Sequence, residues 1–117
     1  MDNEFTRAFD FTGQTIVVTG GAGILCSEMA RALFICGANI AILDYNLDAA
    51  KIVVDDLHRT SGSGKAVAVK TNVLELSSVE AAADQVLSEF GHIDGLINGA
   101  GGNKPDATAS PAKPFFD

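Results

Sequence analysis

The sequence predicts an α/β fold, with four parallel strands in one sheet and helices on both faces. Strand-like and helix-like segments alternate three times before a last strand, and the short connections between them indicate right-handed crossovers. The 117 residues, 47% of them hydrophobic, are enough for one buried core. With a net charge of −7 and scattered Lys and Arg, the chain is not expected to bind nucleic acid or a membrane.

The first strand, first helix and second strand follow one another without a break. Thr15–Thr19 is short, apolar and β-branched, as expected for a strand buried on both faces. From Ala22 to Cys36 the pattern is helical and apolar almost all round, and Gly37 then supplies a left-handed cap. Ile40–Leu43 is predicted to be a second buried strand.

The second helix has a start signal and a clear inner face. Asn46 is a good N-cap, and the helix is expected to break at Ser61–Gly64. Ala66–Val69 then reads as the third strand. The residues expected on the inner face of this helix are Leu47, Ala50, Val54 and Leu57.

A capping box at Ser77 and Glu80 predicts the start of the third helix, and Gly91 predicts its end. Ile93–Ile97 is the expected fourth strand, and the following segment, with three prolines, reads as loop. The residues expected on the inner face of this helix are Val79, Ala83, Val86 and Phe90.

These elements predict a Rossmann-like, doubly wound parallel sheet with strand order 3-2-1-4 and a ligand crevice between strands one and four. The expected division is an N-terminal lead at 1–10, a dinucleotide-binding half-domain at 11–98 and a loop or truncated tail at 99–117. Two helices would cover one face, but a single helix cannot cover the other. We therefore expect an incomplete domain that lacks its C-terminal half and forms a homo-oligomer or self-associates through the uncovered face.

A glycine-rich turn, TGGAGILC at Thr19–Cys26, joins the first strand to the first helix. Glycine lets the backbone approach a pyrophosphate closely, and the helix N-terminus offers free N–H groups and the positive end of its dipole. Read as G-x-G-x-x-G, the turn supplies Gly21 and Gly23, with Cys26 at the last glycine position. A plain tight turn is the alternative, but the flanking strand and helix favour phosphate binding.

Asp44 closes the second strand, a little over twenty residues beyond the glycines. A carboxylate at this point can accept both ribose hydroxyls of an adenosine and repels a 2′-phosphate, which favours NAD over NADP. The alternative is that Asp44 caps the next helix. Asn46 already fills that position, so the ribose role is favoured.

Other polar groups do not indicate a site. SGSGK at Ser61–Lys65 lacks the spacing of a phosphate loop and precedes a strand. His58, expected on a solvated helix face, and His92, expected in a turn, lack metal-ligand spacing, so no metal site is expected. Cys26 and Cys36 lie too far apart on one helix for a disulfide. Free thiols and an acidic N-terminus without a targeting segment favour the cytoplasm.

Four motifs in this order resemble the short-chain dehydrogenase/reductase family over about residues 9–117. They are TGGAGILC, Asp44, TNV at Thr71–Val73 and GHIDGLINGAG at Gly91–Gly101. The resemblance implies NAD as the cofactor. The residues that it places along the cofactor are Thr19, Gly20, Gly21, Gly23, Ile24, Asp44, Asn72, Val73, Asn98, Gly99, Ala100 and Gly101.

The chain departs from the family pattern inside these motifs. Ile24 and Cys26 stand at two glycine positions of the family's T-G-x-x-x-G-x-G turn. Asn72 stands where the family usually has Asp beside the adenine, and Val73 would line the adenine pocket. Gly99 replaces the second Asn of the family's N-N-A-G, which steadies the central sheet and lies along the cofactor.

The family's catalytic set does not match any part of this chain. That set is a Ser, a Tyr-x-x-x-Lys pair and a helix Asn, all after the fourth strand, with Tyr transferring the proton. The only tyrosine here is Tyr45, and Ala49 stands four residues later in place of Lys. No catalytic residue is assigned, and the chain is expected to be inactive alone, with a small-molecule substrate only in the intact enzyme.

The leading hypothesis is the NAD-binding half of an oxidoreductase that moves hydride between nicotinamide and a secondary alcohol or ketone. GILC at 23–26 and AGGNKPDAT at Ala100–Thr108 resemble the D-mannonate/fructuronate oxidoreductase branch, which implies a sugar-acid substrate. Two alternatives remain: a nucleotide-binding module without catalysis, and a methyltransferase-like domain that binds S-adenosylmethionine. Thr19 before the glycines and NGAG after the fourth strand count against the methyltransferase.

Overall fold

The structure, a computed structural model, describes residues 9–99 and confirms the predicted α/β sheet. All strand pairs are parallel and the order is β3-β2-β1-β4, as predicted. The strands are β1 (Thr15–Thr19), β2 (Asn39–Asp44), β3 (Ala66–Lys70) and β4 (Gly95–Asn98). The helices are α2 (Ile24–Ile35), α3 (Leu47–His58) and α4 (Leu76–Phe90).

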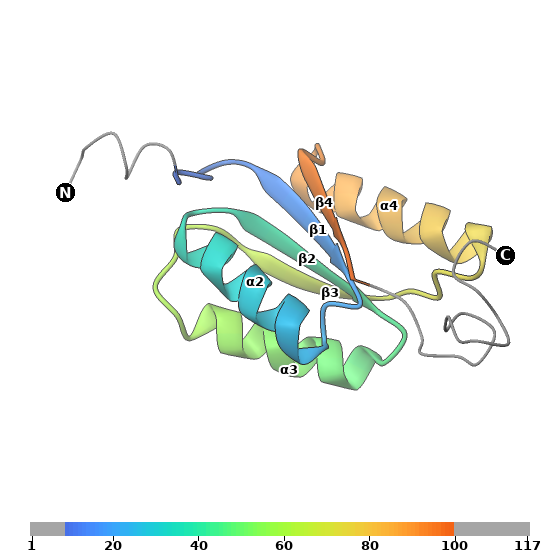
Figure 1. The fold of residues 1–117 in the computed structure, drawn as a ribbon. Helices are drawn as coiled ribbons and strands as arrows, with labels where there is room; N and C mark the ends of the chain where they lie inside the picture. Colours follow the sequence, from blue (N-terminus) through green and yellow to red (C-terminus); the bar gives the residue numbers. More distant parts are fainter. Residues whose placement is uncertain (1–8, 100–117) are drawn as a thin grey trace, which may run out of the picture.

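Two hydrophobic cores hold the helices, one on each face of the sheet. Helices α2 and α3 lie on one side of the sheet and α4 on the other (Figure 1). The larger core contains Phe34 of α2, which is 1% exposed, with Ile40 and Ile42 of β2. The smaller core joins Val17 of β1 to Val86 of α4. Each such side chain contributes about 1.5–3 kcal/mol when fully buried, so most of the stabilisation lies on the α2–α3 face.

The predicted helix signals are confirmed for α2 and α3. The side chain of Asn46 caps α3 by accepting the Ala49 N–H at 3.0 Å. Gly37, after α2, and Gly91, after α4, have φ of +103° and +85°, which side chains with a Cβ rarely adopt. Helix α2 begins two residues later than predicted, because Gly23 is its N-cap.

The capping box predicted at Ser77 and Glu80 is wrong. Helix α4 begins at Leu76, with Glu75 in the extended N-cap position and no side-chain cap. The Glu75 carbonyl accepts the Ser78 and Val79 N–H groups, both at 3.1 Å, so the first helical turn closes there and Ser77 lies inside the helix. The Ser78 hydroxyl accepts the Asn72 N–H at 2.8 Å.

The inner face predicted for α4 is correct except in its first turn. Val79 is 37% exposed, whereas Ala82 and Val86 are buried. Ala83 and Phe90 are half-buried, as the predicted stripe requires. The buried positions of the helix start at Ala82, so packing of α4 against β2 and β3 begins after its first turn.

The fourth strand starts two residues later than predicted, because a side chain holds the segment before it. The Asp94 carboxylate accepts the Thr15 N–H at 2.8 Å, and the Asp94 N–H donates to the Thr15 carbonyl at 2.8 Å. The bond from the Thr15 N–H is the largest cause of a lowered pKa at Asp94, and His92 beside it lowers the pKa further. Asp94 therefore anchors the start of β4 to β1.

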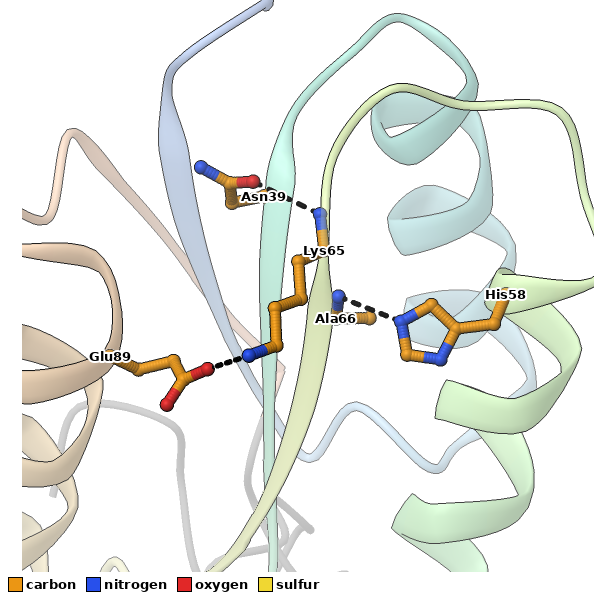
Figure 2. Close-up of polar contacts among 5 residues, drawn as sticks. All are labelled: Asn39, His58, Lys65, Ala66 and Glu89. Atoms are coloured by element: carbon orange, nitrogen blue, oxygen red, sulfur yellow. Dashed lines mark hydrogen bonds and ion pairs between the residues drawn. The ribbon is translucent and has the colours of Figure 1, made fainter.

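The loop between α3 and β3 is a structural connection, and Figure 2 shows how it is fixed. Lys65 pairs with Glu89 of α4, and its backbone N–H donates to Asn39 Oδ1 at 3.0 Å. His58 lies on an exposed face of α3, as predicted, and its side chain also makes a contact that the sequence did not reveal. Its Nε2 accepts the N–H of Ala66 at 3.1 Å, so the imidazole satisfies a donor on the outer edge of β3 (Figure 2).

Candidate cofactor-binding site

The C-terminal ends of the strands meet the start of α2 at one edge of the sheet, where open α/β sheets bind their ligands. Thr19 ends β1, as predicted, and Asn98 ends β4, one residue beyond the predicted end at Ile97. The Thr19 hydroxyl donates to Asn98 Oδ1 at 2.8 Å, and the Thr19 carbonyl accepts the Gly99 N–H at 3.1 Å. These contacts fasten β1 to β4 beside the turn.

The glycine turn needs glycine for two separate reasons. Gly20 has φ +64°, and its N–H donates to the Leu43 carbonyl at 2.8 Å. A Cβ on Gly21 would lie 2.8 Å from Ile42 Cγ2, so a side chain there would collide with β2. The turn therefore lies directly on the end of β2.

The first turn of α2 presents unpaired backbone donors. Gly23 is the N-cap, and within residues 9–99 no side chain caps this helix. An α-helix leaves its first N–H groups without intrahelical acceptors, and here these belong to Ile24, Leu25 and Cys26. Ile24 and Leu25 are 88% and 73% exposed, so solvent reaches this end of the helix. Such a helix start fits an anionic group such as a diphosphate.

Asp44, the last residue of β2, links the glycine turn to the start of α3. Its Oδ2 accepts the Ala22 N–H at 3.1 Å, and its Oδ1 accepts the Asn46 N–H at 2.9 Å. A carboxylate has about four acceptor positions, so about two remain for a ligand. The alternative that Asp44 caps α3 is wrong, because Asn46 performs that role.

The end of β3 adds Asn72 and Val73 to the same edge. The Thr71 N–H donates to the Asp44 carbonyl at 2.9 Å, which holds this end of β3 against β2. Asn72 Oδ1 accepts the Leu74 N–H at 3.0 Å, so one of its two acceptor positions is already used. Val73 is 41% exposed and offers an apolar surface.

Sequence reasoning missed a direct contact between two of the departures from the family pattern. A Cβ built on Gly99 would lie 2.0 Å from Cys26 Sγ. The predicted proximity of the glycine turn and the NGAG motif is thus confirmed as far as Gly99. Ala100 and Gly101 lie outside the described residues. The only signal in the sequence was that Cys26 and Gly99 both depart from the family motifs.

Tyr45 and Lys70 form a pair at the C-terminal ends of β2 and β3. Lys70 Nζ lies 5.5 Å from the centre of the Tyr45 ring, a cation over the ring face. Tyr45 is 68% exposed.

Among the described residues, no three His, Cys, Asp or Glu side chains are grouped to hold a metal ion, and no helix is long and apolar enough to cross a bilayer.

The family model for short chain dehydrogenases matches residues 14–115, which includes every strand of the sheet and the whole candidate site. The chain belongs to the short-chain dehydrogenase family. The family, the fold and the strand order predicted from the sequence are therefore confirmed.

Relatives of this short-chain dehydrogenase chain are longer than the chain itself. An uncharacterised oxidoreductase of Haemophilus influenzae is 46% identical over 102 residues, covering 87% of this chain and 35% of the relative. A solved Haemophilus structure with bound NAD, described as a D-mannonate oxidoreductase, has a TM-score of 0.78 and 38% identity, covering 97% of this chain and 44% of that one. NAD⁺-bound xylitol dehydrogenase has a TM-score of 0.74 and 30% identity, covering 79% and 35%. The chain spans less than half the length of these relatives.

Proposed function

We propose that this chain binds NAD as the cofactor-binding half of a short-chain oxidoreductase acting on a secondary alcohol or ketone. The observation that carries the proposal is the position of Asp44. Its carboxylate bonds to the Ala22 N–H in the glycine turn at 3.1 Å and keeps acceptor positions for a ligand. The uncapped start of α2 follows the same turn, so acceptors for a ribose and donors for a diphosphate lie on one short segment.

The proposed site uses each group for the part of NAD that matches its chemistry. The backbone from Gly20 to Cys26 holds the diphosphate, and Asp44 accepts the two hydroxyls of the adenosine ribose. Asn72 and Val73 lie beside the adenine. Thr19 is assigned with the turn to the diphosphate. Asn98 and Gly99 are assigned to the length of the cofactor, as are Ala100 and Gly101, which lie outside the described residues.

Asp44 also gives the site its preference between cofactors. A 2′-phosphate would bring negative charge to a carboxylate that already accepts hydrogen bonds through both oxygens. Lys70, the neighbour of Asp44 on β3, lies with its Nζ over the Tyr45 ring. NAD is therefore favoured over NADP.

Nicotinamide, when bound, supplies the group that exchanges hydride with the substrate. The residues of this chain bind and orient the cofactor, and we assign none of them to proton transfer. Tyr45 is the only tyrosine, and Lys70 lies over the face of its ring at the adenosine end of the site. The chain is accordingly proposed to be inactive alone.

A sugar acid is the proposed substrate of the intact enzyme. Support comes from the motifs GILC and AGGNKPDAT and from the 38% identity to the Haemophilus protein described as a D-mannonate oxidoreductase.

Self-association through the uncovered sheet face is also proposed. Leu96 of β4 is 62% exposed and Ile93 before it is 39% exposed. Both residues lie at the β4 edge of the sheet. Helix α4 packs on β2 and β3, away from that edge. Sedimentation velocity would test this: a compact monomer at all concentrations would contradict it.

Calorimetric titration of the 117-residue chain tests the proposed function directly. NAD⁺ is expected to bind more tightly than NADP⁺, and S-adenosylmethionine is expected not to bind. Failure of NAD⁺ to bind would refute the cofactor assignment. Binding of S-adenosylmethionine without NAD⁺ would favour the methyltransferase-like alternative instead.

A further inference from the structure

Cys26 and Gly99 compete for one small volume at the crevice. A Cβ on Gly99 would lie 2.0 Å from Cys26 Sγ, 3.0 Å from the Thr19 carbonyl oxygen and 3.6 Å from Cys26 Cβ. The thiol therefore fills the space that a side chain at position 99 would take. A contact at 2.0 Å is impossible, so a side chain at position 99 requires the Cys26 thiol to rotate away, residue 26 to lose its side chain, or α2 to move.

Both partners are fixed to the parts of the site that matter for binding. Gly99 is tied to the end of β1, because its N–H donates to the Thr19 carbonyl at 3.1 Å. Cys26 lies in the first turn of α2 and packs with Ile97 against the larger core. The thiol is thus a spacer between the end of β4 and the helix start that carries the backbone donors.

We propose that Cys26 is a positioning residue, size-matched to Gly99, that sets where the first turn of α2 stands relative to the end of β4. The inference rests on the proposed function, because the donors in that turn are the groups assigned to the NAD diphosphate. A helix is rigid over one turn, so a shift at Cys26 also moves the N–H groups of Ile24 and Leu25. The pair therefore acts on the affinity for NAD through helix placement.

A double-mutant cycle on NAD⁺ affinity tests this coupling. Gly99→Ala is expected to weaken binding about tenfold and Cys26→Gly about threefold, whereas the double variant returns to within about threefold of the native chain. Cys36→Ala, which removes the thiol at the other end of α2, is the matched control and is expected to leave affinity unchanged. A double variant that binds as weakly as the product of the two single losses would overturn the pairing.

Thermal unfolding of the same variants separates positioning from general stability. Recovery in the melting temperature without recovery in NAD⁺ affinity would overturn the positioning role. If the native chain does not bind NAD⁺, the proposed function itself fails. If it binds NAD⁺ but the effects of the two substitutions are independent, only the positioning role of Cys26 fails.

Discussion

Replacing Asp44 by alanine is the sharpest perturbation of the candidate site, because one carboxylate serves both the turn and the proposed ligand. The substitution removes the acceptors of the Ala22 N–H and the Asn46 N–H, at 3.1 and 2.9 Å. It also removes the acceptor positions proposed for the two ribose hydroxyls. The variant should therefore lose NAD affinity by more than it loses stability.

The size of the effect follows from the contacts. Asp44 is half-buried, so each ribose hydrogen bond is discounted to about 1 kcal/mol, below the range for charged groups. Two such bonds give about 2 kcal/mol, or about a 30-fold rise in the NAD⁺ dissociation constant. Water can reach the two freed backbone donors, so unfolding should become easier by only about 1 kcal/mol. Affinity for NADP⁺ should not fall, because the repulsive charge is gone.

Isothermal calorimetry with NAD⁺ and NADP⁺, together with thermal unfolding by circular dichroism, measures both effects. Asp48→Ala is the matched control, because Asp48 is an exposed carboxylate in the first turn of α3, four residues further on. It removes the same charge without touching the turn. If Asp44→Ala binds NAD⁺ as tightly as the native chain, the carboxylate does not hold the ribose and the reasoning is refuted.

Two further predictions concern the fold. His58→Ala should lower stability by about 1–3 kcal/mol, since the Ala66 N–H loses its acceptor, whereas His58→Gln keeps an acceptor and should lose less; equal losses in chemical denaturation would contradict this. Because the pKa of Asp94 is lowered by the Thr15 N–H, its folded carboxyl stays ionised below the ordinary value of 3.8. Its stabilising effect is complete above that value and disappears as the pH falls through the lowered pKa. Asp94→Asn should flatten the acid side of the stability profile, with the exposed Asp84→Asn as a control that leaves the slope in place.

The hydrophobic pattern was sufficient to predict the sheet, because each strand is a short apolar run bounded by a turn. Thr15–Thr19 matches β1 residue for residue, and the order of the strands follows from crossover handedness. Motif spacing also placed Asp44 and Thr19 at the right strand ends. These features depend on local sequence or on general rules of topology.

The boundary errors arose where hydrogen bonds at the end of an element decide where it begins. The Glu75 carbonyl accepts the Ser78 and Val79 N–H groups, so α4 starts before the predicted cap at Ser77. The bond from the Ala66 N–H to His58 crosses a loop, so helix periodicity could not reveal it. The contact of Cys26 with Gly99 joins residues distant in sequence, and only the assembled sheet brings them together.

The bond between Asp44 and the Ala22 N–H affects both the association rate of a ligand and the conformational entropy lost when it binds. Because this bond fixes the turn to the end of β2, we expect that binding orders little of the turn and loses little conformational entropy. Mononucleotide fragments should therefore bind without a prior rearrangement of the turn. Their observed association rates should rise with concentration and should not level off at high concentration.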